Sequence, residues 1–592
     1  MPPINYHLVT TAVEGTCNTD GPNLFLGEWC RLYDRRIIWQ NLDSHLATPY
    51  GTSRAEKDSD QIAITKIKSS LFPIICSLLN KLNDAQYTDR FWKILIGHWF
   101  DYHTKVIFNR FRTLEKCLAD YSITSITFLD SKYSERCVPD TFESAIRNYS
   151  DQNWNESIYQ LIFHELSRSN TKINHVMPSI EVQNHPSIHF KEALSKKLFK
   201  LLWRCHRKFR GFLQDQSSPF IIGSYLPRSE EKKLLNLFRL PSIPERKYEF
   251  KSQSDPDFEL RDKLSQSLID PAQDKYTQFI AKLLFQQIPT CYLEDFDNLM
   301  IASEHLPWPN SPQFIFTSNH FATDELFKIW VGCKADKGVP YITGQHGNNY
   351  GTHRYMNPSV EEETADHFIT WGWSENTKKD IPGFVLKLDG RKLQSYDPNG
   401  GLLLLELHSS LMVSTWDECA EFTKYYTEQQ QFVLKLDASI KDQLTIRLHN
   451  DFSRLSWSEQ SRWHDFDNTL NIDTGVIPLS TKIAATRLVI FSYDSTGILE
   501  TLSQNIPMLA FWQNDLDHLR ESAIPYYQLL KEAKIIHNTP ESAALFINTV
   551  WNDIEGWWQS ETVQGARIEF CKKYANLSHN PAKDLKTILD GF

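Results

Sequence analysis

The chain of 592 residues lacks any cysteine pattern that would indicate disulfide bonds or structural zinc. Its ten cysteines are scattered, and no two of them form a CxxC pair. Disulfide frameworks occur mostly in small secreted proteins, so a long chain with scattered cysteines is expected to keep them reduced. This composition predicts a cytoplasmic protein.

The sequence also lacks a signal peptide and a long hydrophobic run. Its first residues, MPPINYHLVTTAVEGT, contain no basic region followed by an apolar core. The longest apolar runs, such as Leu71–Leu79 and Leu402–Leu405, are much shorter than the roughly 20 residues that span a bilayer. We therefore expect no membrane-spanning segment.

Positive charge is scarce, since the net charge is −10 and the pI is near 6.1. Nucleic-acid-binding proteins usually carry a basic surface, so no nucleic-acid partner is expected, and an anionic substrate would need a local cationic pocket. One segment differs: Lys191–Arg210 predicts a helix with an apolar stripe and many cations. Such a segment is most often a solvated helix face. The alternative is a peripheral contact with an anionic membrane or an acidic acceptor.

Several catalytic motifs are missing as well. The sequence contains no Walker A loop, no GxGxxG, no HExxH and no GxSxG. The DxD strings Asp58–Asp60, Asp255–Asp257 and Asp465–Asp467 are predicted in polar loops without a preceding strand, where a metal–nucleotide clamp is not expected. The sequence thus favours a metal-independent transferase, in which side chains and a helix dipole stabilise a leaving phosphate.

Short apolar runs alternate with helical patterns along the whole chain, which predicts an α/β fold with parallel sheets. We expect two Rossmann-like domains that face a cleft, with helical insertions in the first. The first domain is predicted to span residues 1–375 and to carry the acceptor, the sugar and the catalytic groups. The second, residues 376–592, would bind the nucleotide, and its last helices could pack back on the first. Asn23–Gly27 is interpreted as the first strand.

The stretch Phe314–Trp373 is the most informative. Phe314–Thr317 predicts a buried strand, and Thr323 an N-cap before a helix. A second strand around Pro340–Thr343 is followed by a glycine-flanked polar turn. Ligands of open α/β sheets bind beyond such strand ends. The candidate residues here are Asn319, Asp324, Gln345, His346, Gly347, Glu361 and Glu362. The alternative is that Asp324 only complements the helix dipole and His346 is an ordinary turn histidine.

The second half offers a candidate anion site. Leu488–Phe491 predicts a strand that leads through a hydroxyl-rich loop into a helix, whose first amides and dipole attract phosphate. The candidate donor-binding residues are Tyr493, Asp494, Ser495, Thr496, Glu500, Arg447 and His449. Glu500 would reach ribose hydroxyls. The alternative is an ordinary helix N-cap.

Taken together, these segments resemble a family of roughly 600-residue transferases encoded in bacterial O-antigen and surface-carbohydrate loci. The resemblance rests on LFLGEWCRLYDRR, DRFWKILIGHWF, FTSNHFATDELFKIW, GQHGNNYG, the acids at Glu361–Glu363 and Asp366 followed by WGW, IRLHND, and STGILETLSQNIPMLAFW. The chain departs from the family pattern at Asn348 and at Thr496–Gly497. The resemblance implies a GT-B glycosyltransferase. It also extends distantly to retaining β-Kdo transferases, which use a CMP-activated sugar and an aspartate nucleophile.

The leading hypothesis is therefore transfer of a sugar, by preference a CMP-linked acidic sugar of the Kdo or nonulosonate type, to a surface glycan or lipid-linked glycan acceptor. No cofactor is expected beyond the nucleotide-sugar donor. Asp324 is the first choice as nucleophile or electrostatic stabiliser, Glu361 and Glu362 as acceptor base, and His346 as donor to the leaving phosphate or the sugar carboxylate. The alternatives are CDP-glycerol, a UDP- or GDP-sugar, or a non-catalytic partner in an assembly complex.

Overall fold

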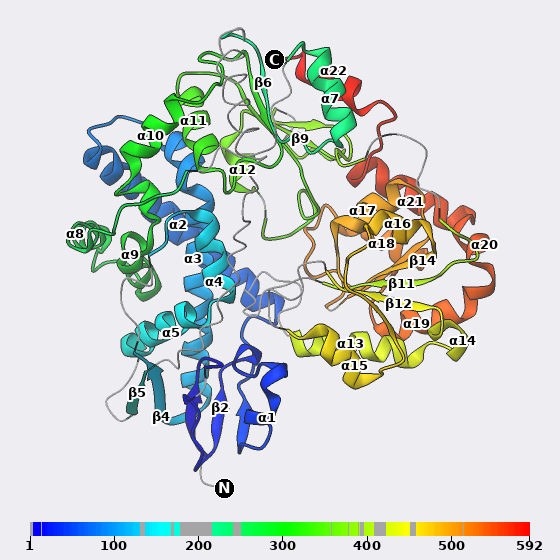
Figure 1. The fold of residues 1–592 in the computed structure, drawn as a ribbon, viewed down its shortest axis with the longest axis horizontal. Coiled ribbons are helices and arrows are strands. Elements are labelled where there is room, and N and C mark those ends of the chain that lie inside the picture. Colours follow the sequence, from blue (N-terminus) through cyan, green and yellow to red (C-terminus); the bar gives the residue numbers. More distant parts are fainter. Residues whose placement is uncertain are drawn as a thin grey trace, which may run out of the picture.

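The computed structural model describes residues 4–130 without 14, 137–166, 171–177, 216–240, 250–407 without 357, 377, 389 and 391–395, 422–449, and 457–592 without 513. Within these ranges the strands form three parallel sheets. Figure 1 shows the N-terminal sheet, the middle sheet and the C-terminal sheet as separate units, with long helices between the first two. The predicted α/β class with parallel sheets in Rossmann-like units is confirmed.

The N-terminal sheet has the strand order β3-β2-β1-β4-β5. Its strands are β1 (Asn5–Val9), β2 (Asn23–Phe25), β3 (Ser44–Leu46), β4 (Ser122–Leu129) and β5 (Lys172–Val176). The prediction that Asn23–Gly27 is the first strand was wrong, because β1 precedes it. The apolar pattern of β1 is interrupted by His7, which is nevertheless buried, with Nδ1 2.8 Å from Ser125 Oγ and Nε2 2.8 Å from the Thr16 carbonyl oxygen.

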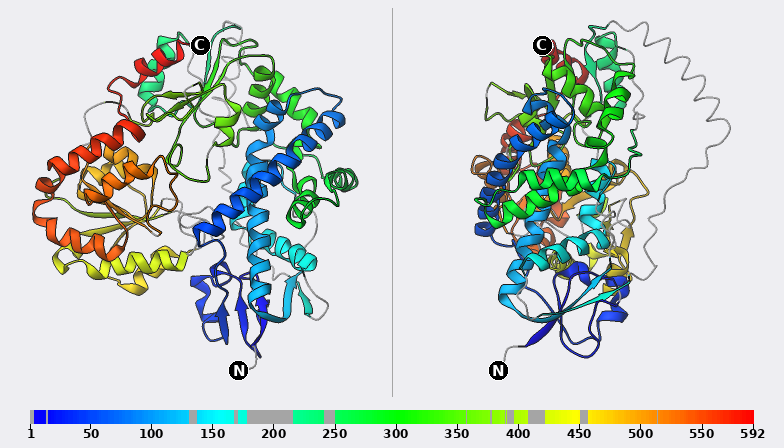
Figure 2. Two further views of the ribbon diagram at one scale, coloured as in Figure 1. Left: turned by 180° about the vertical axis from the view of Figure 1, so that it is seen from behind. Right: turned by 90° about the vertical axis from the view of Figure 1, so that its left-hand side faces the viewer.

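Two long helices connect the first two sheets, α2 (Arg54–Leu82) and α3 (Asp89–Asp120). A capping box of Ser53 and Glu56 starts α2, and the Thr88 side chain accepts from Phe91 N to start α3. Helix α3 contacts β4 of the first sheet and the helices beside the second, and both helices are visible along their length in Figure 2. Helix α3 therefore bridges the first sheet and the helices beside the second.

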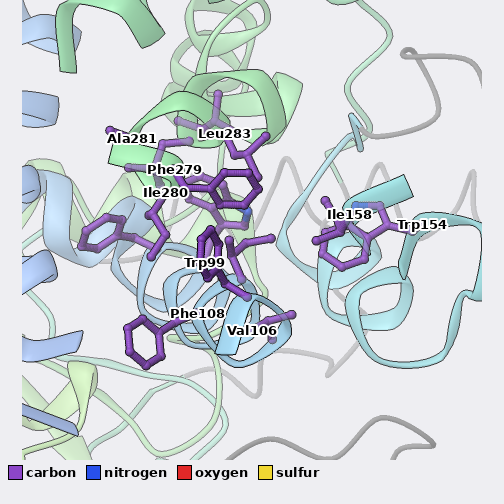
Figure 3. Packing of buried hydrophobic residues seen from close by; sticks show 14 of the residues in the cluster. Trp99, Val106, Phe108, Trp154, Ile158, Phe279, Ile280, Ala281 and Leu283 are labelled. Carbon is purple, nitrogen blue, oxygen red and sulfur yellow. The ribbon is translucent and has the colours of Figure 1, made fainter. Parts of the chain in front are cut away.

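The helices around α3 share the largest hydrophobic cluster of the described residues. Figure 3 shows Trp99 and Phe108 of α3 packing near Phe279 of α9 (Lys275–Gln287), with Trp154 of α5 (Gln152–Leu166) to one side. The surrounding helices are η1 (Glu28–Cys30), η2 (Tyr33–Arg35), α1 (Arg36–Trp39), α4 (Thr141–Ser150), α5 (Gln152–Leu166), α8 (Phe258–Leu268), α9 (Lys275–Gln287), η4 (Thr290–Tyr292) and α10 (Phe296–Glu304).

Helix α2 is, among the described helices, one that is long and apolar enough to cross a membrane by length and composition alone. In the structure, one side of α2 lies in the same hydrophobic cluster as α3, with Leu71 and Leu79 fully buried. The charged residues in its first turns explain why the sequence showed only a short apolar run.

The middle sheet has the order β10-β9-β8-β7-β6. Its strands are β6 (Phe220–Ile221), β7 (Ile315–Thr317), β8 (Tyr341–Gly344), β9 (His367–Thr370) and β10 (Asp380–Pro382). The helices are α7 (Arg228–Leu237), α11 (Glu325–Asp336), α12 (Val360–Thr364) and the C-terminal α22 (Pro581–Leu589). Leu585 and Leu589 of α22 join the apolar residues of α7 and of this sheet in one cluster. The chain therefore returns to the middle sheet at its end (Figure 1).

The C-terminal sheet has the order β13-β12-β11-β14-β15-β16. Its strands are β11 (Gly401–Leu405), β12 (Leu444–Arg447), β13 (Asn471–Asp473), β14 (Thr486–Phe491), β15 (Met508–Phe511) and β16 (Ile536–His537). The helices are α13 (Phe422–Lys435), α14 (Ala438–Lys441), α15 (Glu459–Phe466), α16 (Leu479–Ala484), α17 (Thr496–Ser503), α18 (Ile524–Glu532), α19 (Pro540–Val550), η6 (Trp551–Asp553), α20 (Ile554–Trp558) and α21 (Glu561–Tyr574). The strand order reverses between β11 and β14, the place where doubly wound sheets bind ligands.

Some predictions of local structure need correction. Asp58–Asp60 lies within α2, which the capping box of Ser53 and Glu56 starts, and Asp465 lies within α15, so neither DxD string is wholly a loop. The basic segment Lys191–Arg210 lies outside the described residues. The domain boundary at residue 375 stays a prediction; β10 extends the middle sheet to residue 382.

Candidate active site

The carboxyl edges of the middle and C-terminal sheets meet at one loop. Asn348, in the turn after β8, makes two hydrogen bonds to the C-terminal sheet. Its backbone N–H donates to Thr496 Oγ1 at a distance of 3.0 Å, and its side-chain amide donates to Asp494 Oδ1 at 2.8 Å. Gly347 lies so close that a Cβ there would be 3.1 Å from Thr496 Oγ1. The two regions predicted to hold the sugar and the phosphate are thus in direct contact.

Gln345 and Asp494 are buried and hold these loops from inside. The Gln345 side chain accepts hydrogen bonds from Trp371 N and Trp373 Nε1, each over 2.9 Å, and donates to the Gly347 carbonyl oxygen. Asp494 Oδ2 lies 3.0 Å from His518 Nε2 and accepts from the Tyr527 hydroxyl at 3.0 Å. Since their polar atoms are engaged within the protein, both residues can shape the site without touching a ligand.

A chain of polar groups leads from the site into the interior. The Tyr350 hydroxyl lies 3.0 Å from His346 Nδ1 and donates to Glu361 Oε1, and His98 Nε2 is 3.6 Å from Glu361 Oε2. Burial raises the pKa of Glu361, and burial together with the Lys387 charge lowers the pKa of His346 to about 4. His346 is therefore neutral at pH 7. Because Tyr350 lies between the two residues, the protonation state of Glu361 decides which ring nitrogen of His346 carries the proton.

His98 and Tyr350 were not identified as site residues from the sequence. His98 stacks on Phe321, with ring centroids 5.5 Å apart, and Phe321 also contacts the His346 ring. Burial is the main cause that lowers the pKa of His98 to about 3. His98 belongs to α3, far along the chain from this loop, so spacing could not reveal its association with Glu361. Tyr350 lies only four residues after His346, and this short spacing was the available signal for it.

Glu362 has a different environment from Glu361. Its carboxylate accepts from Ser359 N over 2.7 Å, and Ser359 caps the Glu362 N–H in return, which forms a capping box at the start of α12. Burial raises the pKa of Glu362 to about 7. The side chain is engaged in starting the helix, so Glu361 is the better candidate for proton transfer.

Asp324 is the N-cap of α11, and the prediction that Thr323 caps this helix was wrong. Asp324 Oδ1 accepts from Phe327 N over 3.2 Å, which satisfies a helix-start amide better than a hydroxyl one residue earlier could. Its other oxygen, Oδ2, lies 2.8 Å from Nδ1 of His320. The sequence had indicated the neighbouring Asn319 as a site residue, but Asn319 is exposed, and His320 was not among the predicted site residues.

The other edge of the His320 ring, which carries Nε2, lies against a glycine. A Cβ at Gly223 would lie 2.3 Å from His320 Cδ2 and 2.8 Å from Nε2, and the φ of Gly223 is +54°. A larger residue would clash with the ring. A carboxylate on one ring nitrogen fixes the orientation of a histidine, which suits the ring to proton transfer at the other nitrogen.

A buried cation supports the loop between β7 and α11. Lys328 Nζ pairs with Glu325 at 2.9 Å and donates to the Tyr292 hydroxyl at 2.6 Å and to the Ala322 carbonyl oxygen at 3.2 Å. Both charged side chains are buried. The sequence held one signal of this pair, the spacing of an acid and a lysine three residues apart in a helix with an apolar pattern.

The remaining predicted donor-binding residues do not take part in the contact between Asn348, Thr496 and Asp494. Arg447 forms an ion pair with Asp473 at 2.8 Å, and His449 is exposed beyond β12. Glu500, one turn into α17, pairs with Lys387 at 2.7 Å. Ser495 is the N-cap of α17 and makes no side-chain capping bond, and Tyr493 precedes it in a partly buried position.

No three His, Cys, Asp or Glu side chains within the described ranges are grouped as a metal site requires. A cavity of about 580 Å³ lies away from these loops, between the N-terminal and C-terminal units. Its lining includes Asp34, Arg36, His464 and Asp465.

The fold and the contact between two sheet edges define an α/β protein of the kind that binds ligands beyond its strand ends. A model of the family described as "LIC12162 family transferase" matches residues 6–589. The match spans nearly the whole chain. The protein belongs to the LIC12162 family and is a transferase.

No curated protein matches the sequence significantly. Among solved structures, a UDP complex of UGT89C1 from Arabidopsis thaliana is similar at 11% identity over 82% of this chain and 96% of the other, with a TM-score of 0.30. SsfS6, a glycosyltransferase of Streptomyces sp. SF2575, matches at 11% identity over 63% and 90%, with a TM-score of 0.27. The spinosyn rhamnosyltransferase SpnG with thymidine diphosphate matches at 12% identity over 50% and 80%, with a TM-score of 0.28. TM-scores this low carry no argument about the donor or the acceptor.

Proposed function

We propose that the protein is a metal-independent glycosyltransferase of the GT-B type. The observation that carries this proposal is the contact of the two sheet edges at Asn348, which brings a helix start suited to phosphate beside a loop rich in proton-transfer groups. Transfer from a nucleotide sugar needs the phosphate-binding helix start, which holds the leaving group, within a few ångströms of the proton-transfer groups, which act at the transferred sugar. The family match supports transfer chemistry.

The donor is by preference a CMP-linked acidic sugar of the Kdo or nonulosonate type, and the acceptor a surface glycan such as an O-antigen or its lipid-linked precursor. The sequence resemblance to β-Kdo transferases supports this choice. The nucleotide would lie over β14 and α17. The amides at the start of α17 and the hydroxyls of Ser495 and Thr496 would hold its phosphate, and Glu500 its ribose.

The geometry at α11 supports acceptor activation by His320. Asp324 would hold its Nδ1–H, and Nε2 would take the proton of the acceptor hydroxyl as the new bond to the anomeric carbon forms. The bond from that carbon to the phosphate oxygen breaks, and the nucleoside phosphate leaves with the electron pair. Because both oxygens of Asp324 are already engaged, an orienting role fits it better than that of a nucleophile.

Calorimetric titration of CMP, UDP, GDP and their sugars tests the proposal. We expect wild type to bind one of these nucleotides, and Glu500→Ala to weaken that binding about ten- to a hundred-fold, because a charge-assisted hydrogen bond contributes about 1.5–3 kcal/mol. Binding of none of them would refute the proposal and favour the non-catalytic assembly role.

We also propose that the enzyme works in the cytoplasm, in peripheral contact with an anionic membrane that presents the acceptor. The support is the basic sequence of Lys191–Arg210, which lies outside the described residues, and each cation near an anionic surface contributes about 1 kcal/mol. Vesicle co-sedimentation that falls with salt and with charge reversal of Lys196, Lys197 and Lys200 is expected. Equal recovery in the supernatant with and without anionic lipid would contradict it.

A further inference from the structure

Lys387 is a cation at the place where the proposed donor meets both sheets. It follows β10, and its Nζ lies 2.7 Å from Glu500 of α17, so the ion pair joins the middle sheet to the C-terminal sheet. The sequence assigned this segment to a boundary loop. Nothing in its spacing marked a binding residue.

The surroundings of Lys387 belong to the candidate site. Its Nζ lies over the Tyr225 ring at 5.5 Å from the centroid, and the Tyr225 ring makes an edge contact with His346 at 5.8 Å. The Lys387 charge also acts on His346. The ammonium group is therefore near the loop after β8 as well as the first turn of α17.

Both members of the ion pair remain reachable. The Lys387 side chain is 35% exposed and that of Glu500 is 28% exposed. An ion pair with this much exposure contributes about 0–1 kcal/mol, so a ligand that offers a better partner to each charge can replace it. The acidic net charge of the protein makes a local cation at an anion site the more significant.

We propose that Lys387 binds the phosphate of the nucleotide donor, and that its ion pair with Glu500 holds both side chains in place until the donor enters. The inference rests on the proposed function. On donor binding the Lys387 ammonium turns to the phosphate and the Glu500 carboxylate accepts hydrogen bonds from ribose hydroxyls. One exposed ion pair is thus exchanged for two charge-assisted contacts, which are the stronger interactions.

The test compares CMP with cytidine, which lacks the phosphate, in calorimetric titrations of wild type, Lys387→Met and Glu500→Gln. Methionine keeps the apolar stem that packs on Tyr225 and removes only the charge. Lys387→Met is expected to weaken CMP binding about ten- to a hundred-fold and to leave cytidine binding unchanged. Glu500→Gln is expected to weaken both ligands. Lys378→Met is the matched control, since Lys378 is exposed nearby, and should bind like wild type.

The outcomes separate this inference from the proposed function. Suppose that wild type binds CMP and that Lys387→Met either binds CMP equally well or loses affinity for CMP and cytidine alike. Lys387 then does not contact the phosphate, and the inference is overturned while the proposed function stands. If wild type binds neither CMP nor UDP nor GDP, the function itself fails and the role of Lys387 fails with it. A melting temperature near that of wild type is expected for Lys387→Met, because its ion pair is exposed.

Discussion

Asp324→Asn tests the proposed pairing with His320 most directly. The substitution keeps the N-cap, because asparagine and aspartate cap helices about equally well. The amide oxygen can accept from Phe327 N as the carboxylate does, over the 3.2 Å seen here. Losing the negative charge at the helix start costs about 0.3–1 kcal/mol, so the variant should fold with a small loss of stability.

The chemical consequence is larger. With its oxygen on Phe327 N, the amide turns its NH2 group toward His320 Nδ1, at the site of the present 2.8 Å contact. An NH2 group can only donate, so Nδ1 must be unprotonated and the ring proton moves to Nε2. Nε2 then cannot accept the acceptor proton. General base catalysis contributes about 10²–10⁴-fold, and we expect kcat to fall by about that factor.

The assay measures steady-state transfer with the nucleotide sugar that wild type binds, together with nucleotide affinity and thermal unfolding. Asp324→Asn, His320→Gln and the double variant are compared. Nucleotide affinity should stay near wild type in all three, and the double variant should be no slower than the slower single variant, because the two residues act as a unit. A His320→Gln enzyme that turns over normally beside an inactive Asp324→Asn enzyme would refute the pairing. Asp324 would then act at the anomeric carbon itself, and a covalent sugar adduct on it should be visible by mass spectrometry.

Two further predictions concern stability. Leu585→Ala removes a fully buried side chain from the cluster that α22 shares with the middle sheet, and should lower the free energy of unfolding, measured in urea, by about 2–5 kcal/mol. The control Lys583→Ala alters an exposed side chain and should change this free energy little, and a loss below about 1 kcal/mol for Leu585→Ala would contradict the packing. The folded-state pKa of His346 is lowered to about 4 from an ordinary value near 6.5, so the unfolded chain binds more protons between these values and stability should fall as the pH drops from about 6.5 toward 4. His346→Asn should reduce this pH dependence in unfolding measured at pH 7.5 and 5, and an unchanged dependence would show that His346 does not cause it.

The strands that carry the site could be predicted from the sequence because each is a short apolar run with polar residues directly after it. The predicted Phe314–Thr317 and Leu488–Phe491 agree with β7 and β14 to within two residues at each end. The N-terminal sheet was incompletely predicted because β1 contains the buried His7, whose ring nitrogens bond to the nearby Thr16 and to Ser125, far along the chain. A sequence pattern registers the polar residue and not its partners.

The site shows the same limit more sharply. Asn319 and His320 are neighbours in a loop, and only the fold decides that His320 meets Asp324 while Asn319 is exposed. The polar residues after the strand ends could be predicted as candidates for phosphate binding or proton transfer. The contacts between them could not, because they join residues far apart along the chain, such as Asn348 and Thr496.

The exposed ion pair and the Asn348 hydrogen bonds link the two sheet edges by interactions of modest individual strength. The hydrogen bond from Asn348 N–H to Thr496 Oγ1 joins neutral groups and contributes about 0.5–1.5 kcal/mol, and the partly exposed ion pair of Lys387 with Glu500 contributes about 0–1 kcal/mol. The hydrogen bond from the Asn348 side chain to the buried Asp494 carboxyl group is the stronger link. A donor that gains several charge-assisted contacts can therefore rearrange the ion pair without unfolding either sheet. The buried ion pair behind them, Lys328 with Glu325, is much costlier to disrupt, because loss of one partner would leave a buried charge unpaired. This contrast assigns the adjustable part of the site to Lys387 and Glu500, and the rigid part to the buried groups that hold their loops, Asn348 among them.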